Sequence, residues 1–482
     1  MRVPQAVART ATTDDDAGGW SAALLVVLAC VVLAGALFGY DQGVISGALT
    51  GVQREFALSP LAVEVVTSWV TLGALAGSLA GGELADRLGR RRALLVAAAL
   101  FATGAATEAA APGVAVLVAG RLIVGFGVGV AAVAAPLYAS EMAPARQRGR
   151  FVSCYQLAIT IGIFLSYLVD QALSAGGGWR LMLGVSAVPA LLLLVAVVPA
   201  VESPRWLVRK GRRAEARAAI VRARPWVDPD TRLASIEASL RDEPQDAAWA
   251  EVFAPAWRRP LVIGLGLAIL QQVTGINAII YYADRIFAAA GFATEHAQTQ
   301  ATTWAIGAVN VAATLIAIAF IDRLGRRPLL LAGLAGMGAS LAAVGIAFHT
   351  IDSGGASVFA GTVTLVALVA FIVSFAFSLG PVVWTVINEI FPGRVRGRAV
   401  AVATAVNWGA AFVVSEFFLT LVDAVGESAT FGLFAFFCAA GGLWIWRQVP
   451  ETGGRSLEQI QAMWQADGAP PADAGPAAGA AG

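Results

Sequence analysis

Two ionisable side chains lie inside long apolar stretches of the chain, where a charge is costly unless it has a function. Asp41 lies in an apolar run that begins near Trp20, and Arg121 lies in a later run. Such residues in lipid usually mark an ion or proton pathway. An ionised Asp41 would pair with Arg121, whereas a protonated Asp41 would free Arg121 to reach another acid such as Glu141. The pattern favours a carboxyl that takes up and releases a proton, with a permanent structural ion pair as the alternative.

A second group of charged residues recurs at fixed offsets between the two halves of the chain. Asp86-Arg87-Leu88-Gly89-Arg90-Arg91 returns as Asp322-Arg323-Leu324-Gly325-Arg326-Arg327, an offset of 322 − 86 = 236 residues. Glu141, followed by Arg148-Gly149-Arg150, returns as Glu389 at an offset of 389 − 141 = 248. Acidic and basic groups at helix ends can pair across neighbouring helices and with the helix termini.

We expect these charges to tie the two halves together on one side of the molecule and to separate when that side opens. Solvated helix ends are the alternative, which explains the arginines but not acids at fixed offsets. The candidate gate residues are Asp86, Arg87, Arg91, Glu141, Arg148, Glu202, Arg205, Asp322, Arg323, Arg327, Glu389, Arg396 and Glu451.

The composition indicates that lipid surrounds the elements that carry these residues. Of the 482 residues 58% are hydrophobic and 13% are charged, against ~25% charged in soluble domains. The net charge of +1 gives no support for a nucleic-acid partner. Cys30, Cys154 and Cys438 lie in apolar runs, so we expect no disulfide, metal site or cofactor.

Twelve apolar runs are long enough to span a bilayer, which requires ~20 residues. They fall into two sets of six, separated by a polar segment, and the first is expected to be a retained helix rather than a signal peptide. Parallel repeats of this kind place a substrate site between the halves. The runs are 21–49, 62–84, 92–111, 114–138, 151–171, 180–200, 260–289, 301–321, 328–348, 360–388, 399–422 and 430–447.

The arginines predict the orientation of the chain in the membrane. They concentrate in alternate loops, with Arg54 as the clear exception, and basic loops face the cytoplasm. The expected protein is an all-α membrane protein in the cell inner membrane, with both termini cytoplasmic. Its expected parts are a segment 1–20, a six-helix half 21–200, a linker 201–259, a second six-helix half 260–447 and a tail 448–482.

The linker has a composition of its own. Residues 212–224 and 230–241 read as short charged amphipathic helices separated by prolines. They are either surface helices of a simple connection or a latch that bundles the two halves, and the sequence leaves both open. The tail after Gly468 is rich in Ala, Gly and Pro, which favours disorder.

At this point the motifs resemble the sugar porter family of the major facilitator superfamily over residues 20–464. The two Asp-Arg-Leu-Gly-Arg-Arg loops indicate the superfamily. The glutamine pair Gln271-Gln272 and the ending Pro450-Glu451-Thr452 point to sugar porters specifically, and the chain resembles bacterial proton-coupled hexose and pentose symporters. The other stretches that carry the resemblance are Phe38-Gly39-Tyr40-Asp41, Pro136-Leu137-Tyr138-Ala139-Ser140-Glu141, Glu202-Ser203-Pro204-Arg205-Trp206-Leu207, Val273-Thr274-Gly275-Ile276-Asn277, Gly380-Pro381-Val382-Val383-Trp384, Asn407-Trp408 and Gly453-Gly454.

The resemblance implies the major facilitator fold and a sugar site in a central cavity. Amides both donate and accept hydrogen bonds, as sugar hydroxyls require, and aromatic walls suit the C–H face of a sugar ring. Hydrogen bonding between helices is the alternative for each amide taken alone. One departure is Ile163, where some proton-coupled relatives carry a second glutamine. The candidate substrate-binding residues are Gln156, Gln271, Gln272, Asn277, Trp384, Asn407, Asn310, Trp408 and Phe38.

The resemblance also implies that an acid at Asp41 couples transport to protons, because facilitative relatives carry an amide there. The expected function is therefore monosaccharide–proton symport by alternating access, with the protein acting as a monomer. A passive sugar or inositol facilitator is the alternative, and Asp41 argues against it. A short tail argues against a sugar sensor. The chain has no Gly-Lys-Ser/Thr loop for a nucleotide-driven pump, and no histidine spacing or nucleophile elbow indicates an enzyme.

Overall fold

The computed structural model describes residues 20–144, 148–176, 178–241, 249–320, 324–354, 357–391 and 393–452, and this part of the chain is built from helices. Twelve of its helical spans are long and apolar enough to cross a membrane, which confirms the predicted number. Serine and proline start two of the first helices: Ser21 caps the helix that follows it, and Ser59 caps a helix whose first residue is Pro60.

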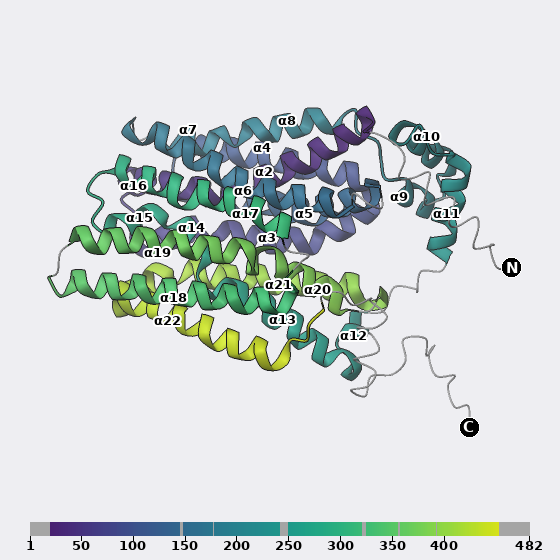
Figure 1. Cartoon of the computed structure of the whole chain (residues 1–482). Helices are drawn as coiled ribbons and strands as arrows, with labels where there is room; N and C mark the ends of the chain where they lie inside the picture. The colour runs from purple at the N-terminus through teal and green to yellow at the C-terminus, as the bar shows by residue number, and fades with distance from the viewer. Residues whose placement is uncertain are drawn as a thin grey trace, which may run out of the picture.

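The first half of the bundle comprises six spans that pack closely on one another (Figure 1). The span predicted at 180–200 is divided into two helices. The elements are α2 (Ala22–Phe56), α3 (Pro60–Leu88), α4 (Arg90–Ala109), α5 (Val114–Met142), α6 (Arg148–Leu173), α7 (Trp179–Val185) and α8 (Ala187–Val197).

The second half also comprises six spans, three of which are assembled from several helical segments. The elements are α13 (Arg258–Val273), α14 (Ile276–Tyr281), α15 (Ala283–Ala289), α16 (Glu295–Ala301), a π-helical segment (Thr302–Ala308), α17 (Val309–Phe320), α18 (Arg326–Asp352), α19 (Ser357–Phe377), α20 (Leu379–Ile390), α21 (Gly393–Glu416) and α22 (Phe418–Gln448).

The break between α13 and α14 is built by a glycine. Gly275 has a φ of 86°, which only glycine adopts without strain, and a Cβ there would lie 2.7 Å from Cδ2 of Phe434. A second break lies at Ser378, between α19 and α20. Irregular backbone at membrane depth is tolerated where protein buries it or where it lines a cavity. Such breaks are also where transporters place binding residues.

The linker helices lie at one end of the bundle, which we call the linker end (Figure 1). They are α9 (Pro204–Arg209), α10 (Arg213–Ala223), α11 (Pro229–Arg241) and α12 (Trp249–Val252). Helices α10 and α11 match the two predicted amphipathic helices. Helix α10 contacts the first half through Ala223, whose carbonyl accepts from the Ser21 hydroxyl at 2.7 Å, and α9 contacts it through Trp206, whose indole donates to the carbonyl of Asp86 at 2.8 Å. Helix α12 packs on α21 instead.

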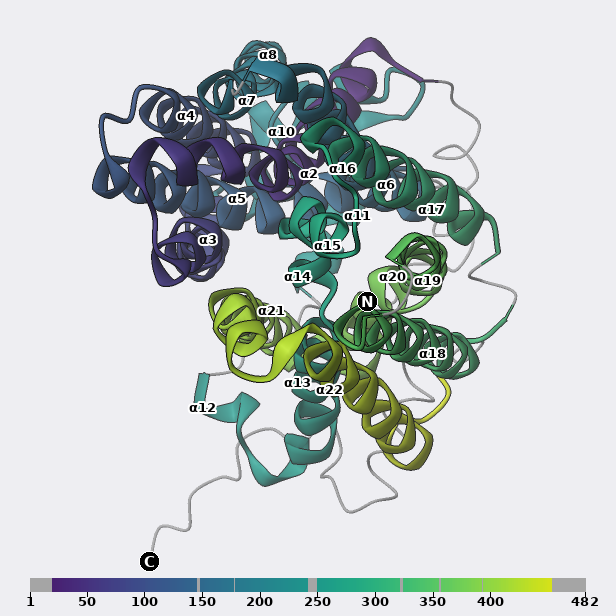
Figure 2. The same ribbon diagram turned by 90° about the vertical axis from the view of Figure 1, so that its left-hand side faces the viewer.

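The two halves meet along α3 with α21 and along α6 with α16, α17 and the π-helical segment. Viewed from the end opposite the linker, the two groups of helices lie next to each other, with α14 and α15 between them (Figure 2). This arrangement brings the acidic residue of α2, the amides of α13 and α14 and the polar residues of α21 toward the boundary between the halves.

Candidate functional site

Asp41 and Arg121 form a buried ion pair, as the sequence predicts. Nη1 of Arg121 lies 2.6 Å from Oδ1 of Asp41, and the two side chains are 0% and 5% exposed. Nε of Arg121 donates to the carbonyl of Val66 at 3.2 Å. The pair therefore joins α2, α3 and α5, which fixes the carboxylate of Asp41 within the first half.

Glu108 is a third member of this cluster that the sequence analysis missed. Its Oε1 lies 3.7 Å from Nη1 of Arg121, and its side chain is 1% exposed. It is the one acid in the third apolar run, a signal that could have placed it with Asp41. Glu141, expected as the other partner of Arg121, instead pairs with Arg90 at 2.9 Å.

Four of the predicted amides form one buried hydrogen-bonded cluster. Nδ2 of Asn407 donates to Oε1 of Gln271 at 2.9 Å, and Nδ2 of Asn277 donates to Oε1 of Gln272 at 2.8 Å. Longer contacts of 3.3 and 3.4 Å join Nε2 of Gln272 to Asn407 and Gln271. The helix break after Val273 places Asn277 beside the two glutamines, so residues of three helices converge on one point.

The remaining predicted sugar contacts surround this cluster to different degrees. The rings of Phe38 and Trp408 lie 5.5 Å apart across the boundary between the halves. Trp384 on α20 and Gln156 on α6 are half-buried, and Asn310 on α17 is buried, but none of the three shares a hydrogen bond with the amide cluster in the described part of the chain. The structure thus unites Gln271, Gln272, Asn277 and Asn407 directly.

At the end opposite the linker, hydrogen bonds and ion pairs cross from one half to the other. Glu64 accepts from the backbone N–H and the hydroxyl of Thr420, and Tyr167 donates to the carbonyl of Ile280 at 2.9 Å. The other crossing pairs are Ser68–Glu416, Gln53–Arg285, Arg54–Glu295, Ser46–Asp284 and Tyr167–Thr303. These contacts hold this end closed.

Two further buried acids lie at this closed end and were also missed. Asp170 on α6 and Asp284 on α15 are 2% and 6% exposed and interact electrostatically across the boundary. Oδ2 of Asp170 accepts from the N–H of Gly47 at 3.3 Å, and Oδ1 of Asp284 accepts from Thr302 at 2.5 Å. Both lie within predicted spans, where an acid is a signal in itself.

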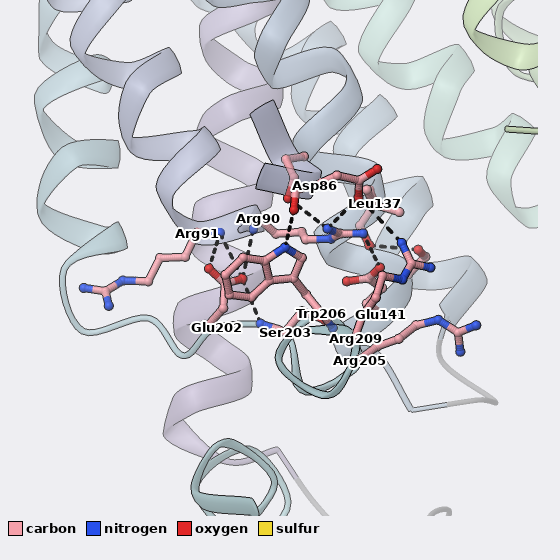
Figure 3. A network of polar contacts seen from close by, with 12 residues as sticks. Asp86, Arg90, Arg91, Leu137, Glu141, Glu202, Ser203, Arg205, Trp206 and Arg209 are labelled. Atoms are coloured by element: carbon pink, nitrogen blue, oxygen red, sulfur yellow. Dashed lines mark hydrogen bonds and ion pairs between the residues drawn. The ribbon is translucent and has the colours of Figure 1, made fainter. Parts of the chain in front are cut away.

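At the linker end, Arg90 is the centre of a charge network in the first half (Figure 3). Its guanidinium is 3% exposed and lies 3.0 Å from Asp86 and 2.9 Å from Glu141. The arginines predicted here from the sequence are its neighbours Arg87 and Arg91, not Arg90. Arg87 is exposed and pairs with Glu83, whereas Arg91 donates to the carbonyls of residues 197 and 198.

Glu202 caps the start of α4 in this network (Figure 3). Its carboxylate accepts from the backbone N–H groups of Arg90, Arg91 and Ser203 at 2.9 to 3.3 Å. Burial raises the pKa of the Glu202 carboxyl, and these three hydrogen bonds act in the opposite direction. Gly89 leaves the space, because a Cβ there would lie 2.2 Å from Oε2 of Glu202.

The second half repeats this arrangement. Glu451 accepts from the backbone N–H groups of Arg326 and Arg327 at 2.9 and 3.1 Å, and Arg326 lies 3.5 Å from Glu389. The contacts named here join each half to the segment that directly follows it in the chain, and they lie within the described residues. Arg396 donates to the carbonyl of residue 391, and Arg205 donates to Ser239 on α11. Asp322, Arg323 and the side chain of Arg148 lie outside the described residues.

Comparison with known proteins agrees with this arrangement of helices. Residues 27–464 match the model of the family described as "Sugar (and other) transporter". The chain is 40% identical over 432 residues to the galactose-proton symporter of Escherichia coli K12, covering 89% of this chain and 92% of that protein. It is 39% identical over 437 residues to the arabinose-proton symporter of the same strain, covering 90% and 92%.

A solved structure shares the fold. The xylose transporter XylE of E. coli, in a partially occluded inward open conformation, matches with a TM-score of 0.78 and 30% identity, covering 90% of this chain and 100% of XylE. The repeated charge networks, the broken seventh span with its amides and the buried Asp41–Arg121 pair thus occur on the fold of a known transporter. This multi-pass membrane protein belongs to the sugar porter family of the major facilitator superfamily, a family of transporters and not of enzymes.

Proposed function

We propose that the protein is a monosaccharide–proton symporter that works by alternating access. The observation that supports proton coupling is the ion pair between Asp41 and Arg121. Oδ1 of Asp41 lies 2.6 Å from Nη1 of Arg121, and the two side chains are 5% and 0% exposed. A carboxylate at this depth is costly and is retained where it moves ions or protons. A passive facilitator would need no titrating acid at this position. The relatives named above as galactose, arabinose and xylose transporters support a pentose or hexose as the cargo.

The amide cluster is the proposed sugar site. Its members bond one another through contacts of 2.8 to 3.4 Å, so a sugar can exchange these for bonds to its own hydroxyls without leaving amides unpaired. Phe38 and Trp408 would supply the apolar wall. We assign Trp384, Gln156 and Asn310 to the outer part of the same site, as ligands that the sugar would reach once it is bound.

The structure is proposed to be the inward-facing state of a monomer in the inner membrane. The arginine-rich linker end would face the cytoplasm, with both termini on that side. Glu64, Thr420 and the other crossing pairs would form the closed outer gate. The charge networks of Arg90 and Arg326 would move toward each other when the inner gate closes. Residues 21–200 and 260–447 would then rock as two units, with 201–259 as the connection.

The test uses purified protein in liposomes that contain a trapped pH dye. D-galactose, L-arabinose, D-xylose and myo-inositol are added outside, and internal acidification is recorded for the wild type and for Asp41→Asn. Acidification with one sugar, lost in Asp41→Asn while exchange of labelled sugar persists, is the expected result. Glu83→Gln is the matched control, because its exposed carboxylate pairs with Arg87 and lies in the same half.

Two outcomes would contradict the proposal. Sugar entry without proton movement in either protein would make the chain a facilitator and Asp41 a structural partner of Arg121. Acidification that persists in Asp41→Asn would show that another group carries the proton.

A further inference from the structure

The buried cluster around Arg121 contains one more carboxylate than a simple ion pair needs. We propose that Glu108 is a positioning residue for proton coupling, which holds Arg121 when Asp41 is protonated. This inference rests on the proposed role of Asp41 as the proton carrier. Glu108 would replace Glu141 as the alternate partner of the guanidinium, since Glu141 is already paired with Arg90 at 2.9 Å.

Arg121 and Glu108 are placed so that the guanidinium can change its partner from Asp41 to Glu108. Nη1 of Arg121 faces both acids, at 2.6 Å from Asp41 and 3.7 Å from Glu108. Among the described residues, Nη2 of Arg121 and Oε1 of Glu108 are both buried without a hydrogen-bond partner. A shift of about 1 Å would bring the second contact to the ordinary hydrogen-bond length of about 2.8 Å.

The packing of α4 on α5 holds Glu108 in this place. A Cβ added to Gly120 would lie 2.6 Å from Cγ of Glu108, so the side chain of Glu108 passes directly over Gly120 to reach Arg121, the next residue. Glycine at this position gives the glutamate the space it occupies. The carboxylate therefore approaches the guanidinium from α4, whereas Asp41 approaches it from α2.

The charges determine the direction of the effect. With both acids ionised the three groups carry a net charge of −1, and binding one proton makes them neutral, which burial favours. Without Glu108, protonation of Asp41 would leave Arg121 as an unpaired buried cation. Glu108 thus makes it easier for Asp41 to bind a proton and keeps the arginine paired in both states.

Other titratable groups on the neighbouring elements do not offer the same exchange. Tyr281 on α14 interacts electrostatically with Arg121 and Asp41. Arg180 on α7 pairs with Glu55 and donates to the carbonyl of Ala111 at 2.9 Å, and Glu64 on α3 is bound to Thr420. None of the variants below alters Tyr281, so its electrostatic effect on Arg121 and Asp41 is the same in all of them.

The test measures the pH dependence of uptake of D-galactose, L-arabinose and D-xylose into liposomes for the wild type, Glu108→Gln and Glu108→Asp. In Glu108→Gln the pH of half-maximal proton-driven uptake is expected to move about one unit toward acid. Glu108→Asp keeps the negative charge on a shorter side chain, so the pH of half-maximal uptake should move less in this variant. Glu83→Gln, an exposed acid of α3 paired with Arg87, is the control and should not move it.

An unchanged pH profile in Glu108→Gln, with uptake retained, would overturn the inference, because a merely structural role lowers the amount of folded protein without moving the profile. If Glu108→Gln does not fold, Glu108→Ala, which also removes the charge, takes its place: an unchanged pH profile in that variant overturns the inference. Asp41→Asn is measured alongside. Sugar-driven proton movement that survives in Asp41→Asn would refute the proposed function itself, a result distinct from a fixed profile in the Glu108 variants.

Discussion

Glu64 on α3 accepts two hydrogen bonds from Thr420 on α22, at 2.6 Å from its backbone N–H and 2.7 Å from its hydroxyl. The glutamate is 0% exposed, so both bonds are shielded from water and join the two halves at the end opposite the linker. The neighbouring pair Ser68–Glu416 joins the same two halves. At the linker end, by comparison, the described ion pair Arg90–Glu141 joins two helices of the first half, and Arg326–Glu389 joins two helices of the second.

Glu64→Ala is expected to open this end, because it removes both bonds to Thr420 and leaves a backbone donor unpaired. A loss of about 2 kcal/mol would shift the ratio of closed to open states roughly thirtyfold. Spin labels at Ala110→Cys and Ser353→Cys, both exposed, would report a longer distance once the three native cysteines are replaced. Thr420→Val, which loses one bond, should give a smaller change, and unchanged distances in both variants would rule out this gate.

Asp284→Asn should act in the opposite direction on the same labels. Asp284 and Asp170 are buried and repel each other across the boundary when both are ionised. An asparagine keeps the acceptor for Thr302 and removes the charge, so the closed end becomes more stable. Relative to the wild type, the label distance should shift toward the short population as the pH is raised and the two wild-type carboxylates ionise. A longer distance would mean that the Asp284 carboxylate itself holds this end closed.

Gln272→Ala tests the sugar site. The substitution removes an amide that bonds Asn277 at 2.8 Å, and leaves partners in a buried cluster unpaired when sugar is bound. The Kd for the transported sugar, measured by quenching of tryptophan fluorescence with D-galactose, L-arabinose and D-xylose, should rise roughly tenfold or more. Asn388→Ala is the control, an exposed amide that bonds only its own helix at Trp384. Unchanged affinity with lower thermal stability would instead identify the cluster as interhelical bonding.

The sequence alone predicts twelve spans, because a run of about 20 apolar residues has few other stable forms. It also predicts the Asp41–Arg121 pair, since each charge is too costly in lipid to stand alone. The helix breaks at Gly275 and Ser378 were not predicted, because hydropathy does not register a change of backbone direction.

Glu108 and Arg90 show why other site residues were missed. Glu108 lies near the end of its run, where an acid resembles an ordinary loop residue, and its burial depends on Gly120 of another helix. Arg90 stands among three consecutive arginines, and sequence cannot distinguish the buried one from the exposed ones. Arg90 is the buried member because it starts α4 directly beside Glu141 and Glu202.

Arg90→Ala should destabilise the protein far more than Arg87→Ala. Removing Arg90 leaves the buried Glu141 without its cation, which costs about 3–5 kcal/mol. Arg87 and Glu83 are 75% and 65% exposed, and a pair of this kind contributes about 0–1 kcal/mol. The midpoints of thermal unfolding in detergent compare the two variants directly. Equal midpoints would show that water can replace the guanidinium of Arg90 with no loss of stability.

Glu202→Gln should alter the dependence of stability on pH. Burial raises the pKa of Glu202 in the folded state, so as pH rises above the unfolded value of 4.5 the unfolded chain ionises first and is favoured. Wild-type stability from this group is therefore fully present below pH 4.5 and declines as pH rises through the folded pKa. Glutamine does not titrate, so the variant should gain stability relative to the wild type over that interval, as thermal midpoints at successive pH values would record. A difference between the two proteins that stays constant with pH would mean that the hydrogen bonds from Arg90, Arg91 and Ser203 fully offset the cost of burying the charge.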